Sequence, residues 1–123
     1  MTQPLALVLY EKLLPGTQLV NRLQDLKYRV QSVSDAALLA ACAEQEKPIV
    51  IFVDLGIASG GVHEAIGQLK RSAETKHIPI IAFGTAAAVE SLEAEKSGAD
   101  VAVNEAAVLN HLPQLLEEAL RVE

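Results

Sequence analysis

The sequence predicts an α/β protein in which a parallel β-sheet is covered by helices on both faces. Short, continuous apolar runs recur along the chain, amphipathic stretches separate them, and Gly, Pro, Ser and Asp stand at the boundaries. Strands that are apolar on both faces are typical of a parallel sheet buried between two layers of helices. With 123 residues, the chain is expected to form a single domain over residues 1–123.

Five segments have the character of strands. The first is the apolar run at residues 5–10, and the third, Ile-Val-Ile-Phe-Val at 49–53, is the clearest in the chain. The remaining strands are expected at 28–33, 78–83 and 101–103. Each run is short and bounded by turn residues, which favours strands over helices.

Helices are expected between the strands. Pro15 and Gly16 interrupt the first apolar run, and Thr17 is a suitable cap for a helix whose leucines recur at helical spacing. The remaining helices are expected at about 36–46, 62–69, 86–97 and 112–120, with Asn110 as the cap of the last one. Strands and helices therefore alternate strictly, which indicates a doubly wound sheet joined by right-handed crossovers.

For five strands the common doubly wound order is 2-1-3-4-5, the flavodoxin-like arrangement. This order places the first strand beside the third, and ligands bind at the carboxyl ends of these two strands. Glu11 follows the first strand and Asp54 ends the third, so the two acids are expected to be neighbours. With the backbone carbonyl of Gly56 they can hold Mg²⁺, which prefers oxygen ligands.

Next to such a metal ion, an Asp carboxylate can attack a phosphoryl group and form an aspartyl-phosphate. The sequence leaves a second interpretation open, in which Asp54 only caps the loop before the next helix and Glu11 is a solvated acid. The single cysteine, Cys42, excludes an internal disulfide, and the three histidines lack the spacing of a metal site.

Composition excludes several classes of function. The net charge is -6 and aromatic residues make up only 3% of the chain, which argues against nucleic-acid binding. No apolar run approaches the ~18 residues of a membrane span, and the N-terminus has no basic region of a signal peptide. A soluble, cytoplasmic protein without nucleic-acid or membrane partners is therefore expected.

Several motifs make the chain similar to the receiver domain of bacterial response regulators. They are Ile-Phe-Val-Asp-Leu at 51–55, Ile-Pro-Ile-Ile-Ala at 78–82 and Ser-Gly-Ala-Asp at 97–100. The resemblance covers essentially the whole chain and implies a signalling module rather than an enzyme. It matches Asp54 to the phosphoacceptor, so self-phosphorylation there is the most that is expected as an activity.

The chain departs from the family pattern at the Mg²⁺ and phosphoryl positions. Two adjacent acids normally follow the first strand, whereas this chain has Tyr10 and Glu11. The hydroxyl residue that ends the fourth strand is replaced by Gly84, with Thr85 one residue later. The resemblance therefore implies a pocket that has lost one metal ligand and one hydrogen-bond donor.

Further departures lie around the fifth strand. The Lys-Pro pair of the family aligns with Glu105 and Ala106, and the aromatic switch residue aligns with Ala102. A Glu in place of the Lys reverses the charge offered to a phosphoryl group. These differences predict an atypical, pseudo-receiver form.

We therefore expect a stand-alone module that acts by protein–protein interaction in a two-component or phosphorelay system, with weak or no phosphorylation. The resemblance implies a histidine kinase or a downstream effector as partner. It also implies a homodimer surface formed by the fourth helix, the fifth strand and the fifth helix, which would carry Val89, Leu92, Val101, Val103 and parts of 108–120.

Three alternatives remain open. The chain can be a functional receiver that is phosphorylated on Asp54 with Mg²⁺, or a flavodoxin-like domain that binds a small molecule or catalyses a reaction, since this fold hosts many chemistries. The Ser59-Gly60 pair also has a faint similarity to the acceptor of anti-sigma antagonists. The strict alternation of strands and helices argues against that last class.

Overall fold

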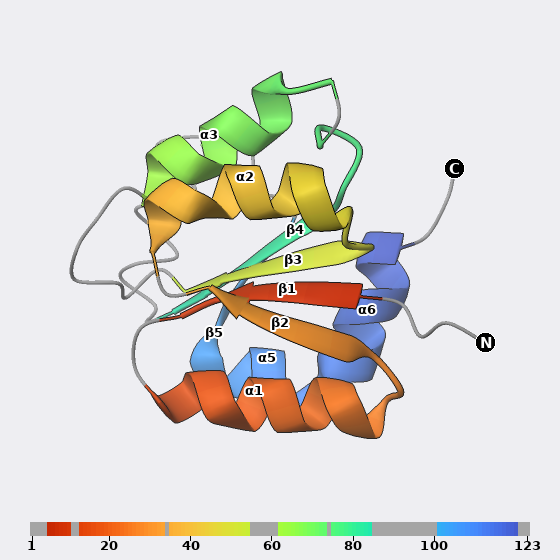
Figure 1. Cartoon of the computed structure of the whole chain (residues 1–123). Coiled ribbons are helices and arrows are strands. Elements are labelled where there is room, and N and C mark those ends of the chain that lie inside the picture. Colours follow the sequence, from red (N-terminus) through yellow and green to blue (C-terminus); the bar gives the residue numbers. More distant parts are fainter. Residues whose placement is uncertain are drawn as a thin grey trace.

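The structure is a computed structural model that describes residues 5–10, 13–33, 35–54, 62–73, 75–84 and 101–120. Five parallel strands form one sheet in the order β2-β1-β3-β4-β5 (Figure 1). The strands are β1 (Leu5–Leu9), β2 (Arg29–Val33), β3 (Val50–Asp54), β4 (Ile80–Gly84) and β5 (Val101–Asn104). The predicted fold class and strand order are confirmed.

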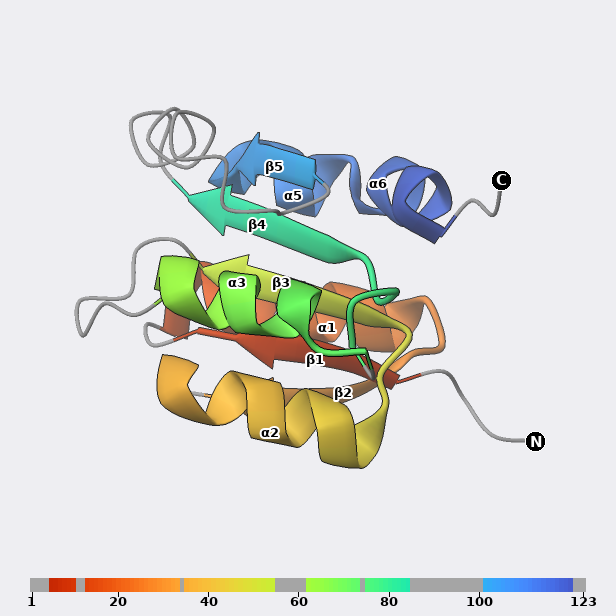
Figure 2. The same ribbon diagram turned by 90° about the horizontal axis from the view of Figure 1, so that it is seen from above.

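Helices cover both faces of the sheet. The described helices are α1 (Leu13–Asp25), α2 (Ala36–Glu46), α3 (Val62–Arg71), α5 (Glu105–Asn110) and α6 (Leu112–Leu120). Figures 1 and 2 show α2 and α3 on one face and α1, α5 and α6 on the other. The predicted helix at 86–97 lies outside the described residues. No described helix is long and apolar enough to cross a membrane.

The core is divided by the sheet into two clusters, because successive strand residues point to opposite faces. Along β3, Ile51 and Val53 pack with α2 and α3, whereas Val50 and Phe52 pack with α1, α5 and α6. All four side chains are fully buried. This two-sided burial explains why the strands have continuous apolar runs rather than an alternating pattern.

Helix α1 begins earlier than the sequence predicts. It starts at Leu13, so Pro15 and Gly16 lie inside its first turn and Thr17 is not its cap. Proline is tolerated there because the backbone N–H groups of the first turn have no partner within the helix. A Pro-Gly pair that looks like a break in the sequence is thus compatible with a helix start.

Helix α5 was not expected from the sequence. The side chain of Asn104 accepts a hydrogen bond of 2.8 Å from the backbone N–H of Ala107 and so caps this helix. Asn110 ends α5 instead of capping α6, and His111 lies between the two helices. Val108 anchors the short helix because it is fully buried against the sheet.

Replacing Asn104 by alanine is expected to lower the free energy of unfolding by about 1 kcal/mol, because the N–H of Ala107 loses its acceptor. Asn104→Ser is the matched control, since serine also caps helices and should retain most of the stability. Urea denaturation of both variants measures the difference. Equal loss in the two variants would contradict the capping role.

Two lysines have left-handed backbone conformations, Lys27 with φ 73° and Lys47 with φ 52°. Both follow helix ends. The N–H groups of Lys27 and Tyr28 donate to the carbonyls of Gln24 and Leu23, both at 3.0 Å, which is the hydrogen-bond pattern that usually has glycine at the left-handed position. The lysine side chain therefore costs stability at both places.

Lys27→Gly and Lys47→Gly are each expected to raise the free energy of unfolding by about 1 kcal/mol, because glycine adopts the left-handed conformation without a steric penalty. Thermal denaturation should show a higher Tm for both variants. Lys27→Ala removes the same charge but keeps a Cβ atom. If alanine stabilised the protein as much as glycine, relief of backbone strain would not be the cause.

Candidate functional site

The candidate functional site lies at the carboxyl ends of β1, β3, β4 and β5. Asp54 is the last residue of β3, and its side chain is only 3% exposed. The register pairs Asp54 with Phe83 of β4, and it pairs Gly84 at the end of β4 with Asn104 at the end of β5. Residues far apart in the sequence therefore meet at the carboxyl ends of the strands, as predicted for this topology.

Local sequence explains the burial of Asp54. The apolar run from Val50 to Val53 forms a central strand with neighbours on both sides, and the acid is the next residue along that strand. A carboxylate taken out of water is costly unless it has partners. Asp54 is not an isolated charge in the structure.

Tyr10 is the residue that directly follows β1. Its backbone N–H donates to the carbonyl of Val33 at 3.0 Å, and the hydroxyl of Ser32 donates to the Tyr10 hydroxyl at 3.4 Å. Both contacts are with the β2 segment, and β1 separates β2 from β3. The Tyr10 hydroxyl is thus directed to the side of β1 opposite Asp54.

The residues that end β4 and β5 offer few side-chain groups that could bind a phosphoryl group. Gly84 has no side chain, and its neighbour Phe83 is fully buried in the core on the α1 side. The carboxamide oxygen of Asn104 accepts the hydrogen bond from Ala107 and is engaged in capping α5. Asn104 was not singled out from the sequence, although an Asn just before Glu-Ala-Ala is a recognisable helix start.

The other predicted site residues are described only in part. Glu11, Gly56 and Thr85 lie outside the described residues. Ala102 lies on β5 and Glu105 begins α5, so the backbone of Glu105 directly follows the end of β5. Within the described part of the chain, no group of three or more His, Cys, Asp or Glu residues could hold a metal ion.

Comparison with known proteins adds information about the fold. No protein-family model and no curated protein matches the chain. The receiver domain of a sensor histidine kinase from Pseudomonas aeruginosa, solved with a magnesium ion in its active site cleft, is similar with a TM-score of 0.85. The two share 20% sequence identity, over 97% of this chain and 98% of that chain.

Two further solved structures agree with this result. A putative response regulator from Chloroflexus aurantiacus has a TM-score of 0.86 at 13% identity, covering 97% of this chain and 98% of that chain. The chemotaxis response regulator CheY4 of Vibrio cholerae has a TM-score of 0.76 at 21% identity, covering 94% of this chain and all of that one. The chain therefore has the fold of the receiver domains of two-component signalling.

Proposed function

We propose that residues 1–123 form a receiver-like signalling domain that acts by protein–protein interaction, with weak or no phosphorylation. The observation that carries the proposal is which residues end the strands around Asp54. The acid is buried at the end of β3, whereas β4 ends in Gly84 and β5 ends in Asn104, whose carboxamide caps a helix. The acid that would be the acceptor is retained, whereas the described residues that end β4 and β5 offer neither a hydroxyl nor a cation to a phosphoryl group.

The energies of the interactions that are missing around Asp54 support a weakened pocket. Two unit charges about 4 Å apart near a protein surface interact by ~4 kcal/mol, and a Glu at position 105 has the wrong sign for a phosphoryl group. A missing hydroxyl at position 84 removes a hydrogen bond to a charged group, worth about 1.5–3 kcal/mol. Together these losses are large enough to suppress phosphorylation by orders of magnitude.

Magnesium is the metal that such a site would use. Asp54 offers a carboxylate, and we propose Glu11 and the carbonyl of Gly56 as its co-ligands. Tyr10 brings no carboxylate, and its hydroxyl contacts Ser32 instead. When bound, Mg²⁺ would offset the charge between the Asp54 carboxylate and an incoming phosphoryl group, which lowers the barrier to attack.

We further propose a histidine kinase or a downstream effector as partner, in the cytoplasm, and no role as an enzyme beyond self-phosphorylation. A homodimer through the predicted fourth helix, β5 and the last helix belongs to the same proposal. The half-buried Val103 of β5 and Leu109 of α5 lie in that region and pack against the core on the α1 side. Nucleic acid and membranes are not part of this function.

An NMR titration tests the proposal. The amide spectrum of the wild type and of Asp54→Ala is followed first with Mg²⁺ and then with Mg²⁺ and beryllofluoride, a phosphoryl mimic. We expect at most weak changes near Asp54, and no changes that spread to β4 and β5. Saturable changes at low Mg²⁺ that spread to both strands in the wild type only would instead establish the alternative, a functional phospho-receiver.

A further inference from the structure

The outer strand β2 leaves one edge of the sheet open. It pairs with β1 from Arg29 to Val33 and has no other neighbour in the sheet of described strands. The carbonyl of Val33 accepts from the N–H of Tyr10, so it points toward β1. Because backbone groups alternate along a strand, those of Val30 and Ser32 point outward. This edge can therefore pair with another extended chain.

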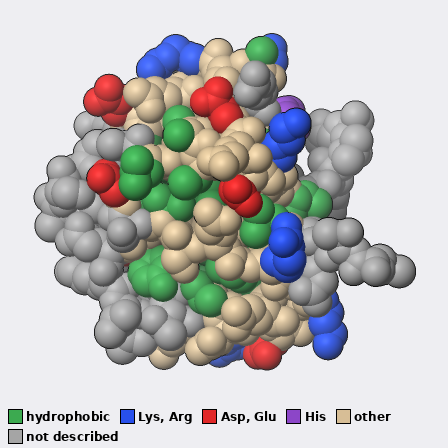
Figure 3. Space-filling model, in the orientation of Figure 1, with side chains coloured by type: hydrophobic (Ala, Val, Ile, Leu, Met, Phe, Trp, Pro, Cys, Tyr) green, Lys and Arg blue, Asp and Glu red, His purple; other side chains and the backbone are tan. Residues whose placement is uncertain are grey.

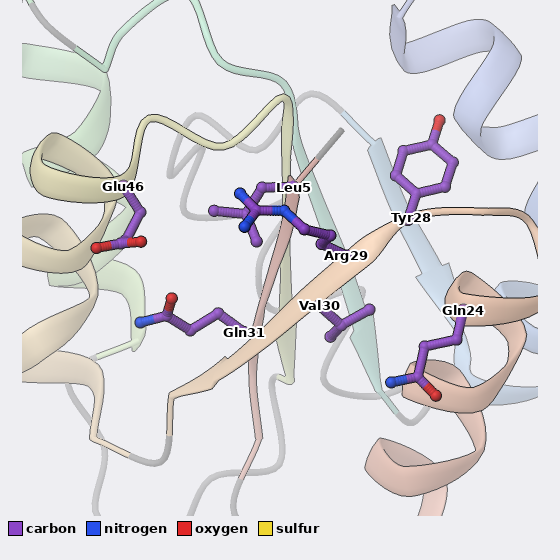
Figure 4. A pocket seen from close by; sticks show the side chains of 7 residues that line it. All are labelled: Leu5, Gln24, Tyr28, Arg29, Val30, Gln31 and Glu46. Carbon is purple, nitrogen blue, oxygen red and sulfur yellow. The ribbon is translucent and has the colours of Figure 1, made fainter. Parts of the chain in front are cut away.

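A hollow of about 440 Å³ extends along this edge. It is lined by Leu5, Gln24, Tyr28, Arg29, Val30, Gln31 and Glu46. Figure 4 shows β2 passing between two groups of these side chains. Arg29 and Gln31 point to the side of α2, where Glu46 lies, whereas Tyr28, Val30 and Gln24 lie on the side of α1.

The two sides of the hollow differ in chemistry. On the α1 side, Tyr28 and Val30 are half-buried and pack against the core. Burial raises the pKa of the Tyr28 hydroxyl, which is consistent with an apolar surrounding. On the α2 side, Arg29 is exposed, and Gln31 and Glu46 add polar groups. One side therefore suits apolar side chains, and the other suits polar ones, with a carboxylate favoured where it faces Arg29 rather than Glu46.

Positive charge is concentrated at the end of the molecule where the strands begin. Within the described ranges, all seven Lys and Arg residues lie where the strands begin, in the last turns of α1 and α3, in the following loops, or at the start of β2. In Figure 3 most of the blue side chains accordingly lie toward the right, where the strands of Figure 1 begin. The acids Asp25, Glu44, Glu46 and Glu117 share this end, so positive charge predominates there among the described side chains.

Lys27 and Lys47 flank the hollow in the sequence, next to Tyr28 and Glu46. Both are held in left-handed conformations in which glycine would be more stable. Strain of this kind is a reason to look for a function of the side chain. A cation beside the hollow would attract an acidic partner, although the whole chain has a net charge of -6.

We propose that the β2 edge binds an extended segment of a partner protein, which adds as a further strand with apolar residues toward Tyr28 and Val30 and a carboxylate toward Arg29. Strand addition explains why the hollow has two sides, because side chains of an extended peptide alternate between the faces of a sheet. The backbone groups of Val30 and Ser32 supply the hydrogen bonds. The charge of Arg29 selects the acidic residue and the register.

A protein segment is favoured over nucleic acid for two reasons. Aromatic residues that could stack on bases make up only 3% of the chain. In addition, only a polypeptide can extend the backbone hydrogen-bond ladder at the β2 edge of the described sheet. This surface is at the opposite edge of the sheet from β5 and lies where the strands begin, whereas Asp54 is the last residue of β3.

The probe is the capped peptide Ser-Val-Thr-Val-Glu-Val-Ser, added to ¹⁵N-labelled protein. We expect the amides of Val30 and Ser32 to shift and to exchange with solvent more slowly when the peptide is bound. Arg29→Gln should weaken binding about three- to tenfold, because one charge-assisted contact is lost at an exposed position. Lys76→Gln is the matched control, since it removes the same charge before β4, three strands away, and should change binding less than twofold.

Further arms separate strand addition from simple charge attraction. A peptide of the same composition with grouped valines loses the alternation, and one with N-methylated backbone loses hydrogen bonds; both should bind at least tenfold more weakly. Ser32→Pro removes the outward N–H while the bonds to β1 stay possible, and should also prevent binding. Equal binding of the grouped peptide, equal effects of Arg29→Gln and Lys76→Gln, or tighter binding of single-stranded DNA would overturn the proposal.

Discussion

Phe83→Ala is expected to lower the free energy of unfolding by about 3–5 kcal/mol, the largest effect of any single change considered. The Phe83 side chain is fully buried in the core cluster on the α1 side, one strand away from Asp54. Alanine leaves a cavity next to the β-sheet that the surrounding side chains fill only in part. Because a domain of this kind is stable by about 5–15 kcal/mol, such a loss brings the protein close to unfolding.

Urea denaturation followed by circular dichroism measures this effect. Phe83→Leu keeps most of the volume and should cost roughly 1–1.5 kcal/mol, which makes it the control for cavity formation. Val30→Ala, at a half-buried position of β2, should also cost much less than Phe83→Ala. A loss below about 1 kcal/mol for Phe83→Ala would mean that the core on the α1 side is not packed as described.

The double variant Gly84→Thr/Glu105→Lys is expected to raise phosphorylation of Asp54 by a small phosphodonor at least tenfold. Threonine supplies a hydroxyl at the end of β4, and lysine reverses the charge that directly follows β5. The two changes together restore roughly 6 kcal/mol of favourable interaction with a phosphoryl group before solvent screening is considered. We expect strong screening by solvent and salt to weaken this interaction, so that a gain of at least tenfold in phosphorylation remains.

Phosphorylation is measured by intact-protein mass spectrometry after incubation with acetyl phosphate and Mg²⁺. Adding Asp54→Ala to the double variant must remove the signal, which identifies the acceptor. Each single variant is expected to give a smaller gain than the pair. No gain in a double variant that is folded would show that the missing hydroxyl and lysine are not what limits the pocket.

The sequence predicts most of the fold because its information is local and repeated. Strand β3 is a run of apolar residues between turn signals, and α2 was expected at the bounds 36–46 that the structure shows. Rules for right-handed crossovers then leave few arrangements, and the order β2-β1-β3-β4-β5 is the common one. The convergence of the strand ends around Asp54 follows directly from that order.

What the sequence does not predict depends on tertiary contacts or on short elements. Helix α5 has six residues, too few for a helical period to be recognised, and its formation depends on the Asn104 cap and on the burial of Val108. The direction of the Tyr10 side chain is set by Ser32 on a neighbouring strand, which no local pattern encodes. The start of α1 was misplaced because Pro15 acts as a breaker inside helices but not in their first turn.

The hollow along β2 could not be inferred from the sequence either. Its lining comes from the ends of α1 and α2 and the starts of β1 and β2, which are brought together only by folding. The left-handed conformations of Lys27 and Lys47 are equally hidden, since lysine is not the residue that usually marks such positions. Sequence patterns therefore located the strand ends around Asp54 and missed the hollow along β2, which lies where the strands begin.

The central claim is that a receiver fold here carries an acceptor with little capacity for phosphorylation. The most direct test is intact-protein mass spectrometry of the wild type, treated with acetyl phosphate and Mg²⁺, beside Asp54→Ala. We expect almost no phosphorylated protein in either sample. Near-complete phosphorylation of the wild type, absent in Asp54→Ala, would contradict it and make this chain a working phospho-receiver.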